Sequence, residues 1–259
     1  MCKFGARLWV GAFLLVLGGC VVTPHPRVTL ETTPQLLGHI ELLNVPFFPQ
    51  EDYQCGPAAL AMALHSAGLQ VTPEVLKTEV YLPGRQGSLQ VDMLATPRRH
   101  GIVAYQLAPG LNELLREVAA GTPVIVLQNL GLGWFPVWHY AVVIGYDLNR
   151  GEIFLRSGRE QRQVLPVSTF ERAWARGDNW AMVVMLTGKI PQSAEEHSFV
   201  SAVSAVEKIG HEARVRDSYA AALQRWPTNF RALMGLGNTA YRMHDFTQAE
   251  VALRQALKD

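Results

Sequence analysis

The spacing of apolar and polar residues changes part way along the chain. Between residues 56 and 120, apolar residues recur at helical spacing, and residues that start or end helices flank each run. The predicted helices cover 56–68, a short segment beginning at Thr72, 89–101 and 112–120. Thr72 suits an N-cap position, and Gly68, Gly101 and Gly121 suit helix C-termini.

From residue 122 the pattern becomes typical of strands. Short runs that are continuously apolar or alternate with period two predict strands over 122–130, 139–147, 152–158, 163–167 and 179–186. Leu148–Gly151 predicts a hairpin turn, and Ser168 suits the N-cap of a helix before the last strand. Helices followed by a mostly antiparallel sheet predict an α+β domain over 43–187.

The pattern is helical again after a predicted linker at 188–195. Residues 236–257 resemble a tetratricopeptide repeat, whose period is 34, at these positions: Leu236, Gly237, Asp245, Phe246, Ala249, Ala256 and Leu257. The same period aligns Ala222 with Ala256. The resemblance implies an all-α repeat segment over 196–259, in which Gly237 lets paired helices approach closely. An unrelated helical hairpin is the alternative.

The first twenty residues have the order of an export signal. Lys3 and Arg7 precede an apolar run at 8–17 that is too short to span a membrane. Gly18-Gly19-Cys20 closes the run and resembles the bacterial lipobox. The resemblance implies a signal peptide over 1–19 and a lipid on Cys20, and a plain signal peptide or short anchor is the alternative.

A lipid on Cys20 would attach the chain to a membrane facing the bacterial periplasm. Val21, which is not acidic, favours the outer membrane. Residues 20–42 are rich in threonine and proline and predict a tether, which as a flexible coil would span on the order of 25 Å.

Composition and charge exclude several classes of function. Apolar residues make up 49% and charged residues 17%, which is typical of a globular protein. Lys plus Arg (23) nearly balance Asp plus Glu (22) without forming a basic stripe, so we expect no nucleic-acid partner. The chain has no phosphate-binding glycine motif and no histidine pair at metal-ligand spacing. We therefore expect neither a cofactor nor a metal.

Cysteine usage draws attention to Cys55. Of three cysteines, Cys2 lies in the predicted signal and Cys20 carries the predicted lipid, so Cys55 has no disulfide partner. Burial as a small apolar residue is the default for such a thiol. However, Cys55 precedes Gly56-Pro57 at the start of a predicted helix, where free backbone N–H groups favour a thiolate.

Two other residues have the chemistry that a sulfur nucleophile needs. His139 opens a predicted strand, and Gln50 lies five residues before Cys55. A thiol, an imidazole and an amide donor together can cleave an amide bond. "VPFFPQEDYQCGPAALAM" and "HYAVVIGYD" resemble the bacteriocin-processing (double-glycine leader) peptidases of the papain-like superfamily. The resemblance covers roughly residues 43–186.

The resemblance implies a role for each matching residue. Cys55 would be the nucleophile, His139 the general base and acid, and Gln50 the oxyanion donor, with Gln54 as the other candidate donor. The family commonly orients its histidine with an Asp or Asn on the next strand, where this chain has Arg156 and Ser157. Arg156 cannot accept a hydrogen bond. Ser157 or a backbone carbonyl would therefore orient the imidazole.

Aromatic residues also precede His139 in the segment "GWFPVW". Trp134, Phe135 and Trp138 either line a substrate groove or cover the edge of the core.

Three hypotheses about function follow. The preferred one is a lipid-anchored cysteine peptidase that cleaves a peptide or protein, with the repeats recruiting the substrate or a protein partner. The second is a peptidase-like scaffold that has lost turnover and binds proteins through the repeats. The third is a cell-wall amide hydrolase, but related enzymes carry Asp-Cys-Ser at the nucleophile and this chain does not.

Overall fold

The computed structural model describes residues 36–50 and 53–258. The predicted signal peptide, Cys20 and the tether as far as residue 35 lie outside these residues. The last residues of the predicted tether form a strand, β1 (His39–Glu41), which pairs antiparallel with β4 (Trp138–Asp147). Backbone pairing with the sheet therefore begins before residue 43, where we expected the domain to start.

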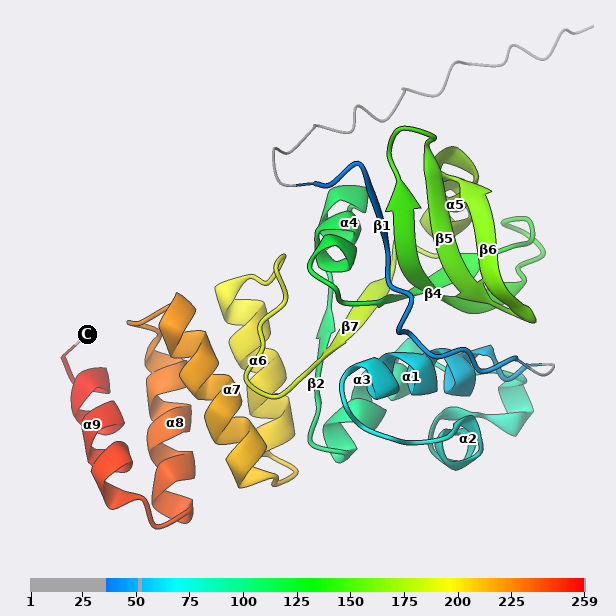
Figure 1. Ribbon diagram of the computed structural model, residues 1–259. Coiled ribbons are helices and arrows are strands. Elements are labelled where there is room, and N and C mark those ends of the chain that lie inside the picture. Colours follow the sequence, from blue (N-terminus) through cyan, green and yellow to red (C-terminus); the bar gives the residue numbers. More distant parts are fainter. Residues whose placement is uncertain (1–35, 51–52, 259) are drawn as a thin grey trace, which may run out of the picture. The chain divides into compact units, whose positions relative to one another are not determined.

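Helices and strands follow one another in the order that the sequence pattern predicts, with some additions (Figure 1). After β1 the elements are α1 (Cys55–Ser66), α2 (Pro73–Val80), the short 3-10 helix η1 (Pro83–Arg85), α3 (Gln90–Arg99), β2 (Val103–Gln106), α4 (Leu111–Ala119), β3 (Val124–Asn129), β4, β5 (Glu152–Ser157), β6 (Glu160–Pro166), α5 (Val167–Ala175), β7 (Ala181–Met185), α6 (Glu196–Glu207), α7 (Glu212–Arg225), α8 (Phe230–Arg242) and α9 (Phe246–Ala256).

Within the described residues the sheet has seven strands, and every pairing in it is antiparallel. Six strands follow the order β2-β7-β3-β4-β5-β6. The first part of β4 pairs with β3, and its last three residues pair with β1. Gly145 lies where β1, β4 and β5 meet, and a Cβ there would lie 2.8 Å from Phe154 Cδ2. Glycine is needed because the three strands approach so closely.

The sheet is covered by helices on both faces. Helix α1 is buried from Gly56 to Leu64 and packs on β3, β4 and β7, with α2 and α3 beside it. Alternate residues of the strands point to the opposite face, where α4 packs on β3 and β4 and α5 packs on β3, β5 and β6. In Figure 1, α1 to α3 lie together beneath strands β4 to β6. The core therefore holds the start of α1 against the middle of the sheet.

Sequence reasoning missed one strand and misplaced the start of one helix. Strand β2 was not predicted, because its four residues make too short a run to indicate a strand without the pairing that β7 provides. Helix α5 begins at Val167 with Pro166 at the N-cap, not with Ser168 there. The Val167 side chain is buried and its N–H donates to Gly151 O (2.8 Å), so tertiary contacts set the start of this helix.

Helices α6 to α9 pack against their neighbours in chain order. A Cβ at Gly237 of α8 would lie 2.6 Å from Leu253 Cγ of α9, which agrees with the close approach expected at this glycine. The side chains of Asn229 and Asp245 cap α8 and α9 by accepting hydrogen bonds from backbone N–H groups. None of the helices in the described part of the chain has the length and apolar character needed to cross a bilayer.

Candidate active site

Cys55 is the first residue of α1, and its side chain is partly buried. Burial raises the pKa of the Cys55 thiol. Backbone hydrogen bonds from Tyr140, Gly56 and Cys55 itself act in the opposite direction, because they favour the thiolate. We expected the helix N-terminus to favour the charged sulfur, and it does, but burial outweighs it.

Gly56 leaves room for the segment that carries Ser88. A Cβ at this position would lie 2.6 Å from Ser88 Cβ and 3.4 Å from Met93 Sδ. Tyr140 holds the Ser88 segment in place, because its hydroxyl donates to Ser88 O (3.3 Å). Glycine is therefore needed at position 56 because the segment between α2 and α3 packs against the start of α1.

His139 lies near the start of β4, and Ser157 ends the neighbouring strand β5. His139 Nε2 is 2.9 Å from Ser157 Oγ, within hydrogen-bond distance. With Nε2 engaged in this way, Nδ1 is the ring nitrogen left to exchange a proton with a thiol. Burial lowers the pKa of His139, which favours the neutral imidazole.

Arg156 has a structural role next to Ser157. Its side chain is buried and donates to the carbonyl oxygens of Gln161 and Val45, the latter at 3.0 Å. The guanidinium therefore ties the segment before Gln50 to β5 and β6. No carboxylate in the described residues forms a hydrogen bond or ion pair with His139, so Ser157 is its side-chain partner.

The Gln50 side chain is 7% exposed, and both its amide oxygen and its amide nitrogen form hydrogen bonds. Gly158 N donates to Gln50 Oε1 (3.1 Å), and Gln50 Nε2 donates to Tyr140 O at the longer distance of 3.4 Å. Because the oxygen is turned toward Gly158, the NH₂ group must face β4 beside His139. Gln54, the other candidate donor, is the N-cap residue of α1.

One cavity of about 1080 Å³ brings three of the predicted site residues together, namely Gln50, Cys55 and His139. Ser157 does not line it and lies behind the imidazole. Sequence reasoning missed Arg85, Arg159 and Asp178, which line the same cavity. They come from three separate segments, and no spacing in the sequence links them to Cys55.

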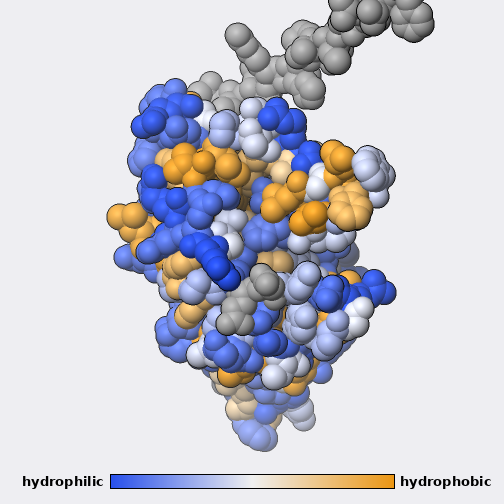
Figure 2. Space-filling model, turned by 90° about the vertical axis from the view of Figure 1, so that its right-hand side faces the viewer, coloured by the Kyte–Doolittle hydropathy of each residue, from blue (hydrophilic) through white to orange (hydrophobic). Residues whose placement is uncertain are grey.

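The β3–β4 loop (residues 130–137) forms one wall of this cavity. Asn129 Oδ1 accepts hydrogen bonds from Gly131 N and Val137 N, both at 2.9 Å, and so holds the two ends of the loop together. Phe135 is 67% exposed and lines the cavity, as does Trp138, whereas Trp134 is 82% exposed and does not line it. Figure 2 shows hydrophobic side chains gathered in patches on one face of the molecule. These aromatic residues do not cover the core.

Burial opposes the charged form of both Cys55 and His139. In the free protein the favoured pair is therefore a neutral thiol and a neutral imidazole, and the imidazole is ready to accept a proton. Within residues 36–50 and 53–258, no three His, Cys, Asp or Glu side chains come together as metal ligands do. The arrangement suits proton transfer and nucleophilic attack by sulfur.

Comparison with known proteins gives a family for this region. No curated protein matches the chain in sequence. Three solved structures are similar in fold. A C39-like peptidase from Bacillus anthracis is 21% identical, with 60% of this chain and 99% of that chain covered and a TM-score of 0.48. A double-glycine motif protease of an AMS/PCAT transporter, solved with the leader peptide, is 21% identical (55% of this chain and 92% of that chain covered, TM-score 0.42), and the peptidase domain of Streptococcus ComA is 17% identical (55% of this chain and 98% of that chain covered, TM-score 0.45). The model of the "Peptidase_C39 like family" matches residues 42–182, more than half of the chain. The chain belongs to this C39-like peptidase family.

Proposed function

We propose that this chain is a cysteine peptidase that cleaves an amide bond in a peptide or protein, with Cys55 as the nucleophile. The cavity that Gln50, Cys55 and His139 share carries this proposal. It places a thiol at a helix N-terminus, an imidazole and an amide donor around one space that is large enough for a segment of peptide. Membership of the C39-like family supports the same chemistry.

In the first half of the reaction, His139 Nδ1 takes the thiol proton as Cys55 Sγ bonds to the substrate carbonyl carbon. The carbonyl electron pair moves onto oxygen, and the Cys55 backbone N–H and Gln50 Nε2 donate to the oxyanion. The C=O bond then re-forms and the C–N bond breaks. The imidazolium gives its proton to the leaving amine, so an acyl-enzyme thioester remains.

Water completes the cycle. His139 accepts a proton from a water molecule as the water oxygen attacks the thioester carbon, and the C–S bond then breaks. The sulfur regains its proton and the acid product leaves. Ser157 acts as a positioning residue, because its hydroxyl engages His139 Nε2 and leaves Nδ1 as the nitrogen for proton transfer.

The setting of this activity is also a proposal. The lipobox-like Gly18-Gly19-Cys20 supports a lipid anchor on Cys20, which would place the enzyme in the bacterial periplasm, most simply at the outer membrane. The repeat-like spacing over 236–257 and the close contact of α8 with α9 support tetratricopeptide repeats. In this role α6 to α9 would recruit a substrate or a protein partner.

A peptide-profiling experiment tests the activity. The full-length chain is incubated with a mixture of peptides from a bacterial proteome, and newly formed termini are identified by mass spectrometry. Cleavage by the wild type that disappears in Cys55→Ala and in His139→Ala supports the proposal. New termini that persist in Cys55→Ala would come from a contaminant and would count against it.

A second function is favoured by two particular observations. Burial favours the neutral thiol of Cys55, and His139 has a serine partner where the family commonly has an acid or amide. Both features weaken activation of the sulfur and fit a protein-binding scaffold with little or no turnover. If the wild type produces no new termini, this scaffold function replaces the peptidase.

A further inference from the structure

Strand β2 lies at one end of the sheet, so one of its edges pairs with no other strand of the described chain. The opposite edge pairs with β7, and the pairing continues past the strand with a bond from Leu107 N to Ala181 O (3.0 Å). Backbone groups of successive strand residues point to alternate sides. Since Leu107 faces β7, the N–H and C=O groups of Ala104 and Gln106 point away from β7. Ala104 is fully buried, so Gln106 is the exposed residue on this edge of the strand.

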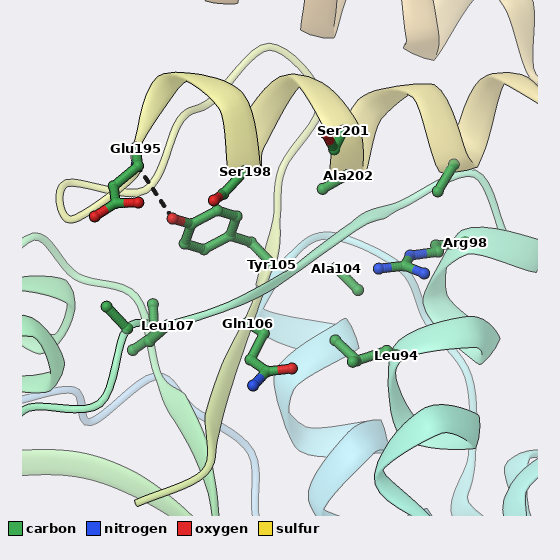
Figure 3. A pocket seen from close by; sticks show the side chains of 12 residues that line it. Leu94, Arg98, Ala104, Tyr105, Gln106, Leu107, Glu195, Ser198, Ser201 and Ala202 are labelled. Atoms are coloured by element: carbon green, nitrogen blue, oxygen red, sulfur yellow. Dashed lines mark hydrogen bonds between the residues drawn. The ribbon is translucent and has the colours of Figure 1, made fainter.

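A groove of about 460 Å³ runs along this edge (Figure 3). Its floor is the strand and its continuation, residues 104–108. One wall is α3, with Leu94 and Arg98, and the other is α6, with small side chains that include Ser198 and Ala202. The groove shares no lining residue with the cavity that contains Cys55.

Arg98 is the charged side chain on the α3 wall. Its Nε atom is buried without a hydrogen-bond partner, and no side chain of the described chain forms an ion pair with its guanidinium. Burial lowers the pKa of Arg98. The adjacent Arg99 differs, because it donates to Thr96 Oγ1 (2.5 Å) and to Glu79 O (3.3 Å). The Arg98 side chain as a whole is only partly buried, so the outer end of its guanidinium remains accessible to a charged group in the groove.

The walls of the groove are fixed relative to each other. His211 Nε2 lies 2.9 Å from Arg99 O, and Arg214 Nη1 donates to His100 O (2.6 Å), so the start of α7 is tied to the end of α3. On the other side, Glu195 N at the start of α6 donates to the Tyr105 hydroxyl (3.1 Å). The groove is therefore a built feature of the fold.

We propose that this groove binds an extended segment of a partner protein, which adds a strand to the free edge of β2 and places an Asp or Glu side chain against Arg98. The exposed backbone N–H and C=O groups of Gln106 would supply the strand hydrogen bonds. The Arg98 guanidinium would supply charge-assisted bonds to the carboxylate. Glu195 lies on the other side of Tyr105 in Figure 3, so the acidic residue is expected at the Arg98 end.

This site is independent of peptide cleavage, because a segment bound at β2 does not enter the cavity of Cys55. The full-length chain with Cys55→Ala therefore serves as the background for the test, and cleavage cannot consume the probe. The probe is a mixture of hexapeptides, acetylated and amidated, with Glu at the third position and the other positions random. A second mixture carries Gln in place of Glu.

Each mixture is passed over immobilised protein, and retained peptides are quantified by mass spectrometry. We expect retention of the Glu mixture to exceed that of the Gln mixture by about tenfold, as a charge-assisted hydrogen bond would give. Arg98→Gln should abolish this difference. The matched control Arg99→Gln makes the same charge change outside the groove and should leave the difference intact.

The strand addition is tested separately with Gln106→Pro. Proline removes the N–H that faces the free edge and leaves the bonds to β7, so a folded variant should retain neither mixture. If this variant does not fold, Ser201→Trp fills the groove from α6 and takes its place. Three results would each overturn the proposal. The parent chain could retain the two mixtures equally, Arg98→Gln and Arg99→Gln could have equal effects, or the variant with the blocked groove could retain the peptides fully.

Discussion

Gln50 and Gly158 exchange two hydrogen bonds in opposite directions: Gln50 N donates to Gly158 O (2.9 Å), and Gly158 N donates to Gln50 Oε1 (3.1 Å). Gly158 directly follows Ser157, which contacts His139. The segment that leads to Cys55 is therefore held to the strand end that orients the imidazole. A substitution at Gln50 should therefore alter the position of Ser157, and a substitution at Ser157 should alter the position of Gln50.

The amide of Gln50 is expected to act on the transition state. Gln50→Glu keeps an acceptor for Gly158 N but removes the Nε2 donor, so we expect kcat to fall by about 10²- to 10³-fold. Gln54→Glu introduces the same charge at the other candidate donor and should have the smaller effect. Steady-state kinetics on a peptide substrate would measure both, and a larger loss with Gln54→Glu would reassign the oxyanion donor.

Ser157 is expected to position His139. Removing its hydroxyl with Ser157→Ala costs one hydrogen bond, so kcat/KM should fall by about 2- to 10-fold. Ser157→Thr retains the hydroxyl and is the matched control. At acid pH, kcat/KM falls as His139 becomes protonated, and the midpoint of this fall reports the pKa of His139. The midpoint should therefore also move in Ser157→Ala. An unchanged profile and rate in Ser157→Ala would show that the backbone alone orients the ring.

The protonation state of Cys55 can be measured directly by alkylation. Only the thiolate reacts, and burial raises the pKa of this thiol, so the rate should increase with pH around a midpoint above about 8.5. The lowered pKa of His139 places the acid limb of kcat/KM below about pH 6.5. A low alkylation midpoint that is lost in His139→Ala would instead establish a thiolate–imidazolium pair in the free protein.

Gly56 should be needed for the stability of the fold. Gly56→Ala places a Cβ 2.6 Å from Ser88 Cβ, and we expect a loss of about 1–3 kcal/mol in the free energy of unfolding. Ser88→Gly removes the obstructing side chain and should recover most of the loss in the double variant. Urea denaturation of the four proteins in this cycle gives the coupling energy, and simple additivity would contradict the packing argument.

Two neighbouring aromatic residues provide a matched pair for substrate binding. Phe135 lines the cavity of Cys55 and Trp134 does not, although both are exposed. Phe135→Ala should raise KM for a peptide substrate because it removes apolar contact area, and Trp134→Ala should leave KM close to the wild-type value. The reverse ranking would place the substrate on the outer side of the β3–β4 loop.

Most elements with strong local signals could be predicted from the sequence. The alanine-rich run after Cys55 forms α1, and Gly68 and Gly121 follow helices with positive φ, as expected for helix C-termini. The long apolar runs formed β3, β4 and β5. These features depend on residues a few positions apart, whose propensities and capping chemistry act within one element. The residue types at Cys55, His139 and Gln50 likewise pointed to sulfur chemistry before any fold was known.

Other features depend on contacts between distant segments. Strands β1 and β2 exist because β4 and β7 pair with them, and the few residues in each are too weak a signal alone. The direction in which the Gln50 amide faces was decided by Gly158, more than one hundred residues away. The balance between thiol and thiolate at Cys55 was decided by burial, which no spacing in the sequence measures. Local propensity determines the elements, whereas desolvation and long-range hydrogen bonds arise only once the chain has packed.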